Sequence, residues 1–321
     1  FRRVLFRSGG YMLYFIVNEK SKSGNAKQIW KEIEEVLKVR NVSYQAFVSE
    51  YRGHAGKLAA EICAMDDNDI CLVAVGGDGT ANEVINGITD FEKVRFGVIP
   101  TGSGNDLARG LSLSKDPKNG AIHILNAMKK SREDTWCMDL GEVNFGEEKR
   151  LFAISAGIGL DALVCKKALK STIKDILNKI RLGKLTYLVL TVQSLFTMQT
   201  ADAEIFFDRE EGLQKKRMIF TAAMNFKAEG GGVPMAPAAS ACDGKLSFCE
   251  AAGIPKWRTF LCLPFLVAAK HTSIHGFSVT DAKDCTIRLS RPMVVHADGE
   301  YCGEVTEVHF HCLPGKLRVL K

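Results

Sequence analysis

A glycine-rich turn between an apolar run and a helical pattern constrains the fold more than any other feature. Residues 70–75 read ICLVAV, the continuous apolar run of a buried parallel strand. GGDGT follows at 76–80, and residues 81–88 have helical spacing. A second loop, TGSGN at 101–105, follows the strand predicted over 95–99. Because ligands bind beyond the carboxyl ends of parallel strands, the two loops predict a binding site at one sheet edge.

The rest of the first half supports a parallel α/β domain. Strands are predicted at 12–18 and 43–48, and helices at 28–39 and 54–64. The second half changes character, with a mostly helical insert predicted over 161–198, interrupted at Gly183. The remaining predicted strands, which indicate an antiparallel β domain, are 136–143, 150–156, 201–208, 216–225, 245–252, 284–289, 293–297, 305–311 and 316–320.

Length and composition exclude several classes of protein. The chain has 321 residues, which suggests two domains, and its 46% hydrophobic and 25% charged residues exclude disordered and collagen-like chains. The longest apolar run, 259–269, is broken by Pro264 and is too short to span a membrane. The net charge is +6, and without Arg2, Arg3 and Arg7 it is +3, which is too mild to indicate nucleic-acid binding. Residues 1–11, which precede Met12, are expected to be a non-native or disordered extension. The sequence shows no signal-peptide pattern, so a cytoplasmic location is expected.

Cysteine and histidine residues show no clear metal pattern. None of the ten cysteines has C-x-x-C spacing, so buried reduced thiols are expected. His309 and His311 alternate on one predicted strand and point the same way, but no third ligand is evident. They are therefore interpreted as surface or packing residues.

The two glycine-rich loops have the chemistry of a phosphate site. Gly76, Gly77 and Gly79 let the backbone approach a ligand closely, and free amides at a helix N-terminus bind phosphate. Asp78 beside bound phosphates implies a cation between them, hence magnesium. Asp106 stands at the corresponding helix start of the second loop. A tight turn with an Asp cap is the alternative for either loop, but the pair together favours metal-assisted phosphoryl transfer.

At this point the sequence resembles a known family. GGDGTANEVINGI and PTGSGNDLAR resemble the soluble bacterial diacylglycerol-kinase-type lipid kinases, which share a catalytic domain with diacylglycerol, sphingosine and ceramide kinases. Further matching segments follow in the expected order: MDLGEVN, SAGIGLDALV, KLTYLVLTVQSL, GGGVPMAPAASACDGKL and HADGEYCGE. The resemblance implies a Rossmann-like N-terminal α/β domain, similar to NAD kinases and phosphofructokinases, and a C-terminal antiparallel β-sandwich domain with a helical insert.

The resemblance also implies a domain division. An α/β nucleotide-binding domain is expected over 12–138, and a β-rich lipid-substrate domain over 139–305. Residues 306–321 are expected to form C-terminal strands, and a return of these strands to the first domain is left open. Two closely joined domains are expected to form a cleft that holds the site.

Functional residues are carried over by position. The residues implied to bind ATP are Asn18, Ser49, Gly76, Gly77, Asp78, Gly79, Thr80, Ala81, Asn82 and Ser103. Asp78, Asp106 and Asp139 are implied to hold the catalytic magnesium through water. A second, structural magnesium is implied at Ser240, Asp243 and Lys245, with Ser240 and Lys245 acting through backbone carbonyls.

Two assignments stay open in the sequence. Asp298 and Glu300 of HADGEY match the family's general base, and either could take the proton; on pattern alone, Asp298-Gly299 is a hairpin turn. The first loop, NEKSKSGN at 18–25, departs from the family's N-P-x-S-G pattern, so Lys20 and Lys22 are both candidates for a phosphate-neutralising lysine.

The expected reaction is the ATP-dependent phosphorylation of diacylglycerol to phosphatidic acid. The alternatives are another lipid acceptor (phosphatidylglycerol, a sphingoid base or a polyprenol), a soluble polyol, or an inactive nucleotide- or lipid-binding regulator. Residues 164–184 form a basic amphipathic segment that fits either a packed helix or peripheral contact with a membrane. Its basic residues are Lys166, Lys167, Lys170, Lys174, Lys179, Arg181 and Lys184. A homodimer is plausible for the family.

Overall fold

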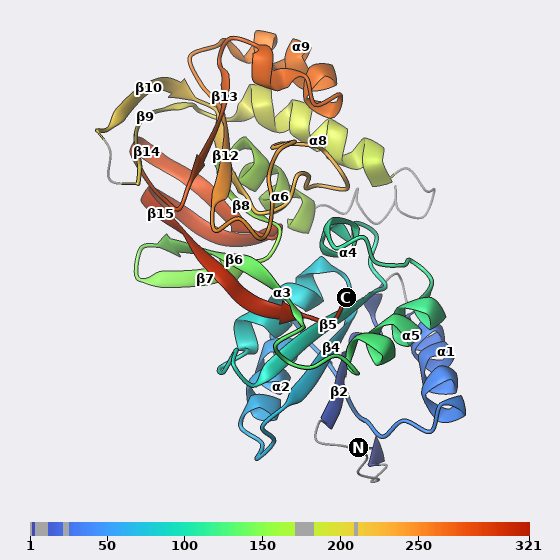
Figure 1. The fold of residues 1–321 in the computed structure, drawn as a ribbon. Helices are drawn as coiled ribbons and strands as arrows, with labels where there is room; N and C mark the ends of the chain where they lie inside the picture. Colours follow the sequence, from blue (N-terminus) through green and yellow to red (C-terminus); the bar gives the residue numbers. More distant parts are fainter. Residues whose placement is uncertain (1, 4–11, 22–25, 171–182, 209–210) are drawn as a thin grey trace. The chain divides into compact units, whose positions relative to one another are not determined.

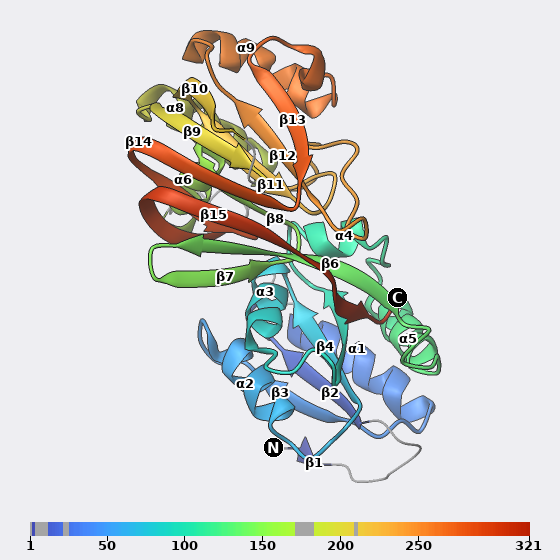
Figure 2. The ribbon, with the colours of Figure 1, turned by 60° about the vertical axis from the view of Figure 1, so that its left-hand side comes forward.

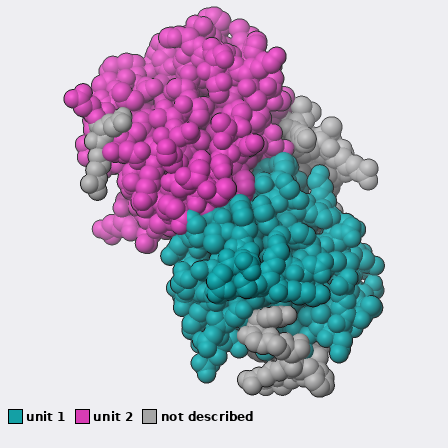
Figure 3. Space-filling view, viewed as in Figure 1, with its two compact units in different colours: residues 1–138, 315–321 teal, residues 139–314 magenta. Residues whose placement is uncertain are grey.

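The computed structural model describes residues 2–3, 12–21, 26–170, 183–208 and 211–321. The chain forms two compact units, shown in different colours in Figure 3. Unit 1 comprises residues 1–138 and 315–321, and unit 2 comprises residues 139–314.

Unit 1 contains a parallel sheet in the order β3-β2-β4-β5. These strands are β2 (Met12–Val17), β3 (Gln45–Val48), β4 (Ile70–Gly76) and β5 (Val94–Pro100). Every residue of β4 and β5 is buried, as their continuous apolar runs predicted. The short β1 (Arg2–Arg3) pairs antiparallel with β3.

Helices cover both faces of this sheet, as Figure 2 shows. On one face, α1 (Ala26–Val39) packs beside α5 (Pro117–Ala127), and on the other, α2 (His54–Cys63) packs beside α3 (Asp78–Gly87). The short α4 (Asp106–Gly110) follows β5. Side chains alternate along the strands, so that Phe15 and Val73 join the core formed with α1 and α5.

Unit 2 is mainly an antiparallel β structure. Its central order is β15-β14-β8-β11-β12-β13, and β9 pairs with both β14 and β10. The bounds are β6 (Trp136–Phe145), β7 (Glu148–Phe152), β8 (Ser155–Gly159), β9 (Ala201–Phe207), β10 (Leu213–Met218), β11 (Phe220–Met224), β12 (Leu246–Ala251), β13 (Phe277–Ala282), β14 (Asp284–Ala297) and β15 (Glu300–Val319). The last residues of β15 belong to unit 1, where Arg318 and Val319 pair in parallel with β5.

The helices of unit 2 include the predicted insert. It contains α6 (Leu160–Lys170) and α8 (Gly183–Thr197), and Figure 1 shows α8 beside α9 (Lys256–Val267). A short 3-10 helix follows at His271–Ser273. None of the helices in the described ranges is long and apolar enough to cross a membrane.

Several predicted strand boundaries in unit 2 were wrong. The strand expected over 150–156 is divided into β7 and β8, because the amides of residues 153–155 bond to a carboxylate instead of a neighbouring strand. The strand expected over 216–225 is likewise divided, at Ile219, which lies between β10 and β11. Two residues earlier, Arg217 has a positive φ of 52°, and the register of β10 shifts between Lys215 and Met218. Conversely, β14 and β15 each join two expected strands. In β14 the register shifts between Arg288 and Met293, around Pro292, which lacks the N–H that a regular ladder requires.

The sequence did not predict the helix α5 in unit 1, nor two elements of unit 2. β13 and α9 lie in the segment between the strands expected at 245–252 and 284–289. The pattern of α9 is apolar around its whole circumference, and Pro264 interrupts it. It therefore lacks the one-sided stripe by which an amphipathic helix is recognised.

Candidate functional site

The two glycine-rich loops of unit 1 meet backbone to backbone at the carboxyl ends of β4 and β5. The Thr101 amide donates to the Gly76 carbonyl at 2.8 Å. A Cβ built on Gly102 would lie 2.7 Å from the Gly77 Cα, and one built on Gly76 would lie 2.5 Å from the Thr80 side chain. Both distances are too short for a real Cβ, so glycine is required for this approach.

Asp78 connects the two loops through its carboxylate. Its Oδ2 accepts the amide N–H of Asp106 and its Oδ1 that of Leu107, both at 3.1 Å, so that it caps the first turn of α4. A Cβ built on Gly104 would lie 3.1 Å from the Asp78 Oδ2 and 3.7 Å from the Asp106 Oδ2. The two carboxylates therefore flank Gly104. Asp106 also pairs with Arg109, whose guanidinium donates to the Gly104 carbonyl at 2.9 Å.

The loop after β2 reaches the same edge of the sheet. Asn18 donates its amide N–H to the Val75 carbonyl at 2.9 Å and its side-chain Nδ2 to the Thr80 hydroxyl at 3.0 Å. The Lys20 ammonium donates to the Glu50 carbonyl at 2.7 Å. The other lysine candidate, Lys22, lies outside the described residues. Asn18 thus joins the GGDGT loop directly, whereas Lys20 is bonded to the segment after β3.

The other predicted nucleotide residues have different surroundings. Ser49 follows β3, is buried, and contacts the Val17 carbonyl through its hydroxyl at 3.5 Å. Ala81 and Asn82 are buried within α3, and Ser103 is exposed in the second loop. Gly79 lies in the first turn of α3. The amides at the start of this ten-residue helix form the part of unit 1 best suited to an anion.

In unit 2, Asp298 and Gly299 form the tight turn between β14 and β15 that the sequence predicted. Their φ angles are 48° and 81°, the left-handed values of a two-residue hairpin turn. The Asp298 carboxylate accepts three amide N–H groups, from Ala153 and Ile154 at 2.8 Å and from Ser155 at 3.1 Å. Glu300 is the first residue of β15 and is only partly buried.

A buried histidine–carboxylate pair lies beneath this turn. His296 contacts the Asp161 Oδ2 through its Nε2 at 3.1 Å, and its Nδ1 accepts the Gly299 amide N–H at 3.2 Å. Burial lowers the pKa of His296, the hydrogen bond and charge of Asp161 raise it, and the net direction is upward. A Cβ on Gly157 would lie 1.8 Å from the Asp161 Oδ2, so Gly157 makes room for the pair.

The sequence interpretation missed this pair. It treated His296 as one of several scattered histidines, although His296 and Asp161 lie in the segments HADGEYCGE and SAGIGLDALV. Their occurrence in two matching segments was the available signal.

Asp139 lies in unit 2, beside the segment predicted to hold the second magnesium. Its Oδ2 accepts the Gly244 amide N–H at 2.7 Å, and its own amide N–H donates to the Ala241 carbonyl at 2.8 Å. Asp243 is exposed and its Oδ1 accepts the Lys245 amide N–H at 3.1 Å. The structure therefore brings Asp139 together with the turn formed by Asp243 and Gly244.

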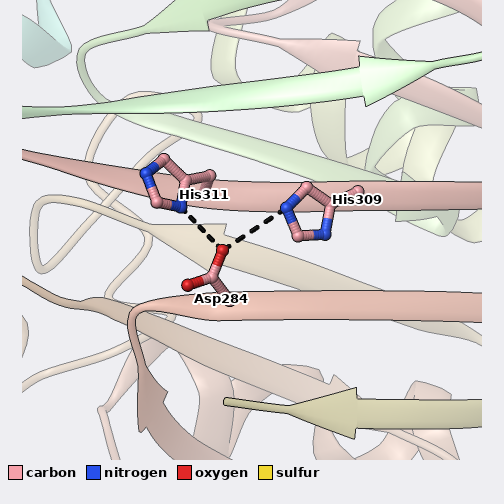
Figure 4. A group of neighbouring side chains, drawn as sticks. All are labelled: Asp284, His309 and His311. Atoms are coloured by element: carbon pink, nitrogen blue, oxygen red, sulfur yellow. Dashed lines mark hydrogen bonds and ion pairs between the residues drawn. The ribbon is translucent and has the colours of Figure 1, made fainter. Parts of the chain in front are cut away.

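His309 and His311 have a third potential ligand, contrary to the sequence interpretation. Asp284, on the neighbouring strand β14, lies between them in Figure 4. The sequence did not indicate it, because Asp284 is 25 or more positions away and only the pairing of β14 with β15 brings it there. Asp161, Glu229 and His296 form a second such group within the described part of the chain.

The predicted basic amphipathic segment is only partly described. Lys166 pairs with Glu304 and its ammonium lies 4.9 Å from the centre of the Tyr301 ring. Lys167 donates to the Thr197 hydroxyl at 3.0 Å. Lys174, Lys179 and Arg181 lie outside the described residues, as does the rest of 171–182.

Comparison with known proteins identifies two family domains in the chain. Residues 12–138 match the diacylglycerol kinase catalytic domain, and residues 155–321 match the YegS C-terminal NAD kinase beta sandwich-like domain. The protein named "Putative lipid kinase YtlR" from Bacillus subtilis is 30% identical over 311 residues, covering 95% of this chain and 98% of that protein. A diacylglycerol kinase of Bacillus subtilis is 28% identical over 251 residues, covering 76% of this chain and 75% of that protein.

Solved structures confirm the fold. A crystal structure of a diacylglycerol kinase from Bacillus anthracis superposes with a TM-score of 0.68 at 18% identity, covering 96% of each chain. An NAD kinase from Archaeoglobus fulgidus has a TM-score of 0.52 at 14% identity, covering 97% of this chain and 94% of that one. The predicted combination of a parallel α/β domain and an NAD-kinase-like β-sandwich domain is thereby confirmed. By its two domains and its near full-length match to a relative, the chain belongs to the diacylglycerol kinase family of ATP-using lipid kinases.

Proposed function

We propose that this protein transfers the γ-phosphoryl group of ATP to the free hydroxyl of diacylglycerol, giving phosphatidic acid. The observation that carries the proposal is the pair of glycine-rich loops joined by Asp78 at the carboxyl edge of the unit 1 sheet. It is supported by the relatives that are named diacylglycerol kinases. The acceptor is the finer part of the proposal, because the family includes more than one lipid kinase.

Unit 1 would bind the nucleotide through its backbone. Gly76, Gly77 and Gly79 leave the amides at the start of α3 accessible to phosphate oxygens, and Thr80 adds a hydroxyl that Asn18 orients. Ser49, Ala81, Asn82 and Ser103 complete the proposed nucleotide site. Since phosphoryl transfer depends mainly on positioning and charge, fixed amide donors are well suited to it.

The carboxylates present fit magnesium. Asp78 and Asp106 flank Gly104 with oxygen atoms, the ligands that this hard cation prefers. These two residues would hold the ion through water, and it would supply positive charge beside the transferred phosphoryl group. A second magnesium would be held by the Asp243 carboxylate and the carbonyls of Ser240 and Lys245.

We further propose that Glu300 takes the proton of the acceptor hydroxyl, while Asp298 is a positioning residue. The Asp298 carboxylate already accepts three amide N–H groups, which occupy most of its lone pairs. With both of its oxygen atoms held by backbone amides, the Asp298 carboxylate is poorly placed to act on an acceptor hydroxyl. Asp298 would instead hold the hairpin turn from which Glu300 extends.

The test is a transfer assay with labelled ATP, magnesium and a panel of lipids in mixed micelles. Label in phosphatidic acid is the expected result, and Glu300→Gln is expected to lose it while still binding ATP. Label in phosphorylated phosphatidylglycerol, a sphingoid base or a polyprenol would show that this lipid, and not diacylglycerol, is the acceptor. ATP binding without any labelled lipid would favour an inactive regulator and refute the proposal.

A further inference from the structure

Two packed helices of unit 2 carry a large apolar surface that is exposed in the described part of the chain. Eight of the thirteen exposed large hydrophobic side chains in the described ranges lie on α8 and α9. Their exposed fractions run from 40% to 66%. We call this surface the α8–α9 apolar face, and its members are Leu188, Val189, Phe196, Trp257, Phe260, Leu261, Phe265 and Val267.

The helix α9 is apolar on both of its faces. Thr259, Cys262 and Leu266 are buried against unit 2, while Leu261 and Phe265 point outward with exposed fractions of 57% and 50%. A helix that is apolar all round is normally covered on all sides, by protein or by lipid. Within the described ranges, one side of α9 is covered and the other is exposed.

The two helices form one surface. The rings of Phe196 and Phe260 lie 6.1 Å apart, and the Lys256 ammonium donates to the Phe196 carbonyl at 3.3 Å. Figure 1 shows α8 and α9 side by side. The apolar side chains of the two helices therefore meet at Phe196 and Phe260, and an exposed apolar patch of this kind marks an interaction surface.

The charge around this face favours an anionic lipid surface over a protein partner. Residues 256–270 include Lys256, Arg258 and Lys270 and no acidic residue, and residues 183–200 contain no acidic residue either. Trp257 is 60% exposed, and tryptophan is enriched where apolar and polar regions of a bilayer meet. Apolar side chains bordered by cationic ones are typical of helices that lie in the plane of a membrane interface.

We propose that the α8–α9 apolar face inserts into the headgroup region of an anionic bilayer and holds the enzyme on the membrane. The role of this membrane binding rests on the proposed function, because a kinase of diacylglycerol must reach an acceptor that resides in the bilayer. Its physical basis is independent of which lipid is phosphorylated.

The experiment measures binding to vesicles of phosphatidylglycerol and phosphatidylcholine by co-sedimentation and by tryptophan fluorescence. Trp30 is buried, and Trp136 lies under the Lys321 ammonium, 3.7 Å from its ring centre, so Trp257 is the reporter. We expect a blue shift of the emission on binding, absent in Trp257→Phe. Leu261→Asp and Phe265→Asp are each expected to weaken binding by ~10-fold or more, because each removes a large apolar side chain from the lipid and adds an anion.

The matched control is Val39→Asp, which changes an 87% exposed apolar residue on α1 of unit 1. It should leave vesicle binding unchanged. Equal sedimentation of Leu261→Asp and the parent would overturn the proposal, as would a concentration-dependent dimer that Leu261→Asp dissociates. Transfer to short-chain diacylglycerol in detergent tests the proposed function separately, since it does not require docking.

A different observation supports a second site in unit 2, a divalent transition-metal site. Figure 4 shows Asp284 between His309 and His311. The Asp284 Oδ1 lies 2.6 Å from the His311 Nδ1 and 3.4 Å from the His309 Nε2. Asp284 faces His311 across the β14–β15 ladder, and both histidines lie on the same face of β15.

The three residues offer the ligand atoms that a zinc-type ion prefers, and these atoms lie within 4.8 Å of one another. Bonds of 2.0–2.1 Å in tetrahedral geometry place ligand atoms about 3.3 Å apart, close to the 3.4 Å between Asp284 and His309. The 2.6 Å between Asp284 and His311 is a hydrogen bond, and these two atoms would have to move apart to bind one ion. The Thr286 hydroxyl lies 2.9 Å from the His309 Nδ1. If it accepts the Nδ1 proton, the Nε2 lone pair faces Asp284, the arrangement by which a hydrogen-bond partner orients a metal-binding histidine.

We infer that Asp284, His309 and His311 bind one divalent ion of the zinc class, with its remaining position open to solvent. The test is titration of the metal-stripped protein with Zn²⁺ by calorimetry and with Co²⁺ by its visible spectrum. One equivalent should bind, and His309→Ala, His311→Ala and Asp284→Asn should each lose it. His275→Ala, at an exposed histidine of the same unit, is the control. Binding that survives in all three variants would overturn the inference.

Discussion

Asp298→Ala should destabilise unit 2 strongly, because it removes the acceptor of three amide N–H groups. Ala153, Ile154 and Ser155, which carry them, are all at least 96% buried. At ~1.5 kcal/mol for each bond to a charged group, the loss is about 4–5 kcal/mol. Alanine at the φ of 48° adds about 1 kcal/mol of backbone strain. The total of about 5–6 kcal/mol corresponds to a melting temperature lower by about 10–24 °C for a unit of this size.

The comparison with Asp298→Asn and Glu300→Gln makes this reasoning specific. Asparagine tolerates the left-handed conformation and keeps one acceptor oxygen, so it should cost only about 2 kcal/mol. Glu300→Gln should change the melting temperature by less than about 2 °C and yet abolish lipid phosphorylation. Calorimetry and the transfer assay are run on all three variants. An Asp298→Ala protein that melts within 2 °C of the parent would refute the argument, as would full activity of Glu300→Gln.

Three further expectations concern the loops and thiols. Asp78→Ala leaves the amides of Asp106 and the following residue without their acceptor, so unit 1 should lose about 2–4 kcal/mol and ATP binding should weaken, as thermal shift with and without ATP would show. Cys137 and Cys242, the exposed thiols, should react rapidly with an aromatic disulfide at pH 8, and the other eight slowly. Burial raises the pKa of Cys302 from 9.0 to about 11. The folded state therefore holds the thiol proton more tightly than the unfolded state. The contribution of Cys302 to the free energy of unfolding should be complete below pH 9 and be lost as the pH rises through 11. Denaturation at graded pH would detect this fall in stability, and Cys302→Ala should make it smaller.

The sequence by itself determined the α/β half of the protein and its loops. Buried parallel strands read as continuous apolar runs, and the helices between them carry one-sided stripes, so ICLVAV and its neighbours identified the sheet. The glycines of GGDGT and PTGSGN indicated that the backbone comes into close contact at these loops, because only glycine permits the contact of Gly77 with Gly102. The adjacent pair Asp298-Gly299 likewise predicted the hairpin turn that these two residues form. All of these signals are local in the chain.

The tertiary structure alone decided which distant groups share a bond. Asp78 was expected beside magnesium, yet its carboxylate also caps α4, 28 positions later. Asp298 accepts amides 143–145 positions earlier, which divides an expected strand into β7 and β8. Asp284 meets His309 and His311 only because β14 pairs with β15 in one register. Such contacts depend on strand order, pairing register and the path of the chain, and these follow from the packing of the whole unit, which no local pattern of residues contains.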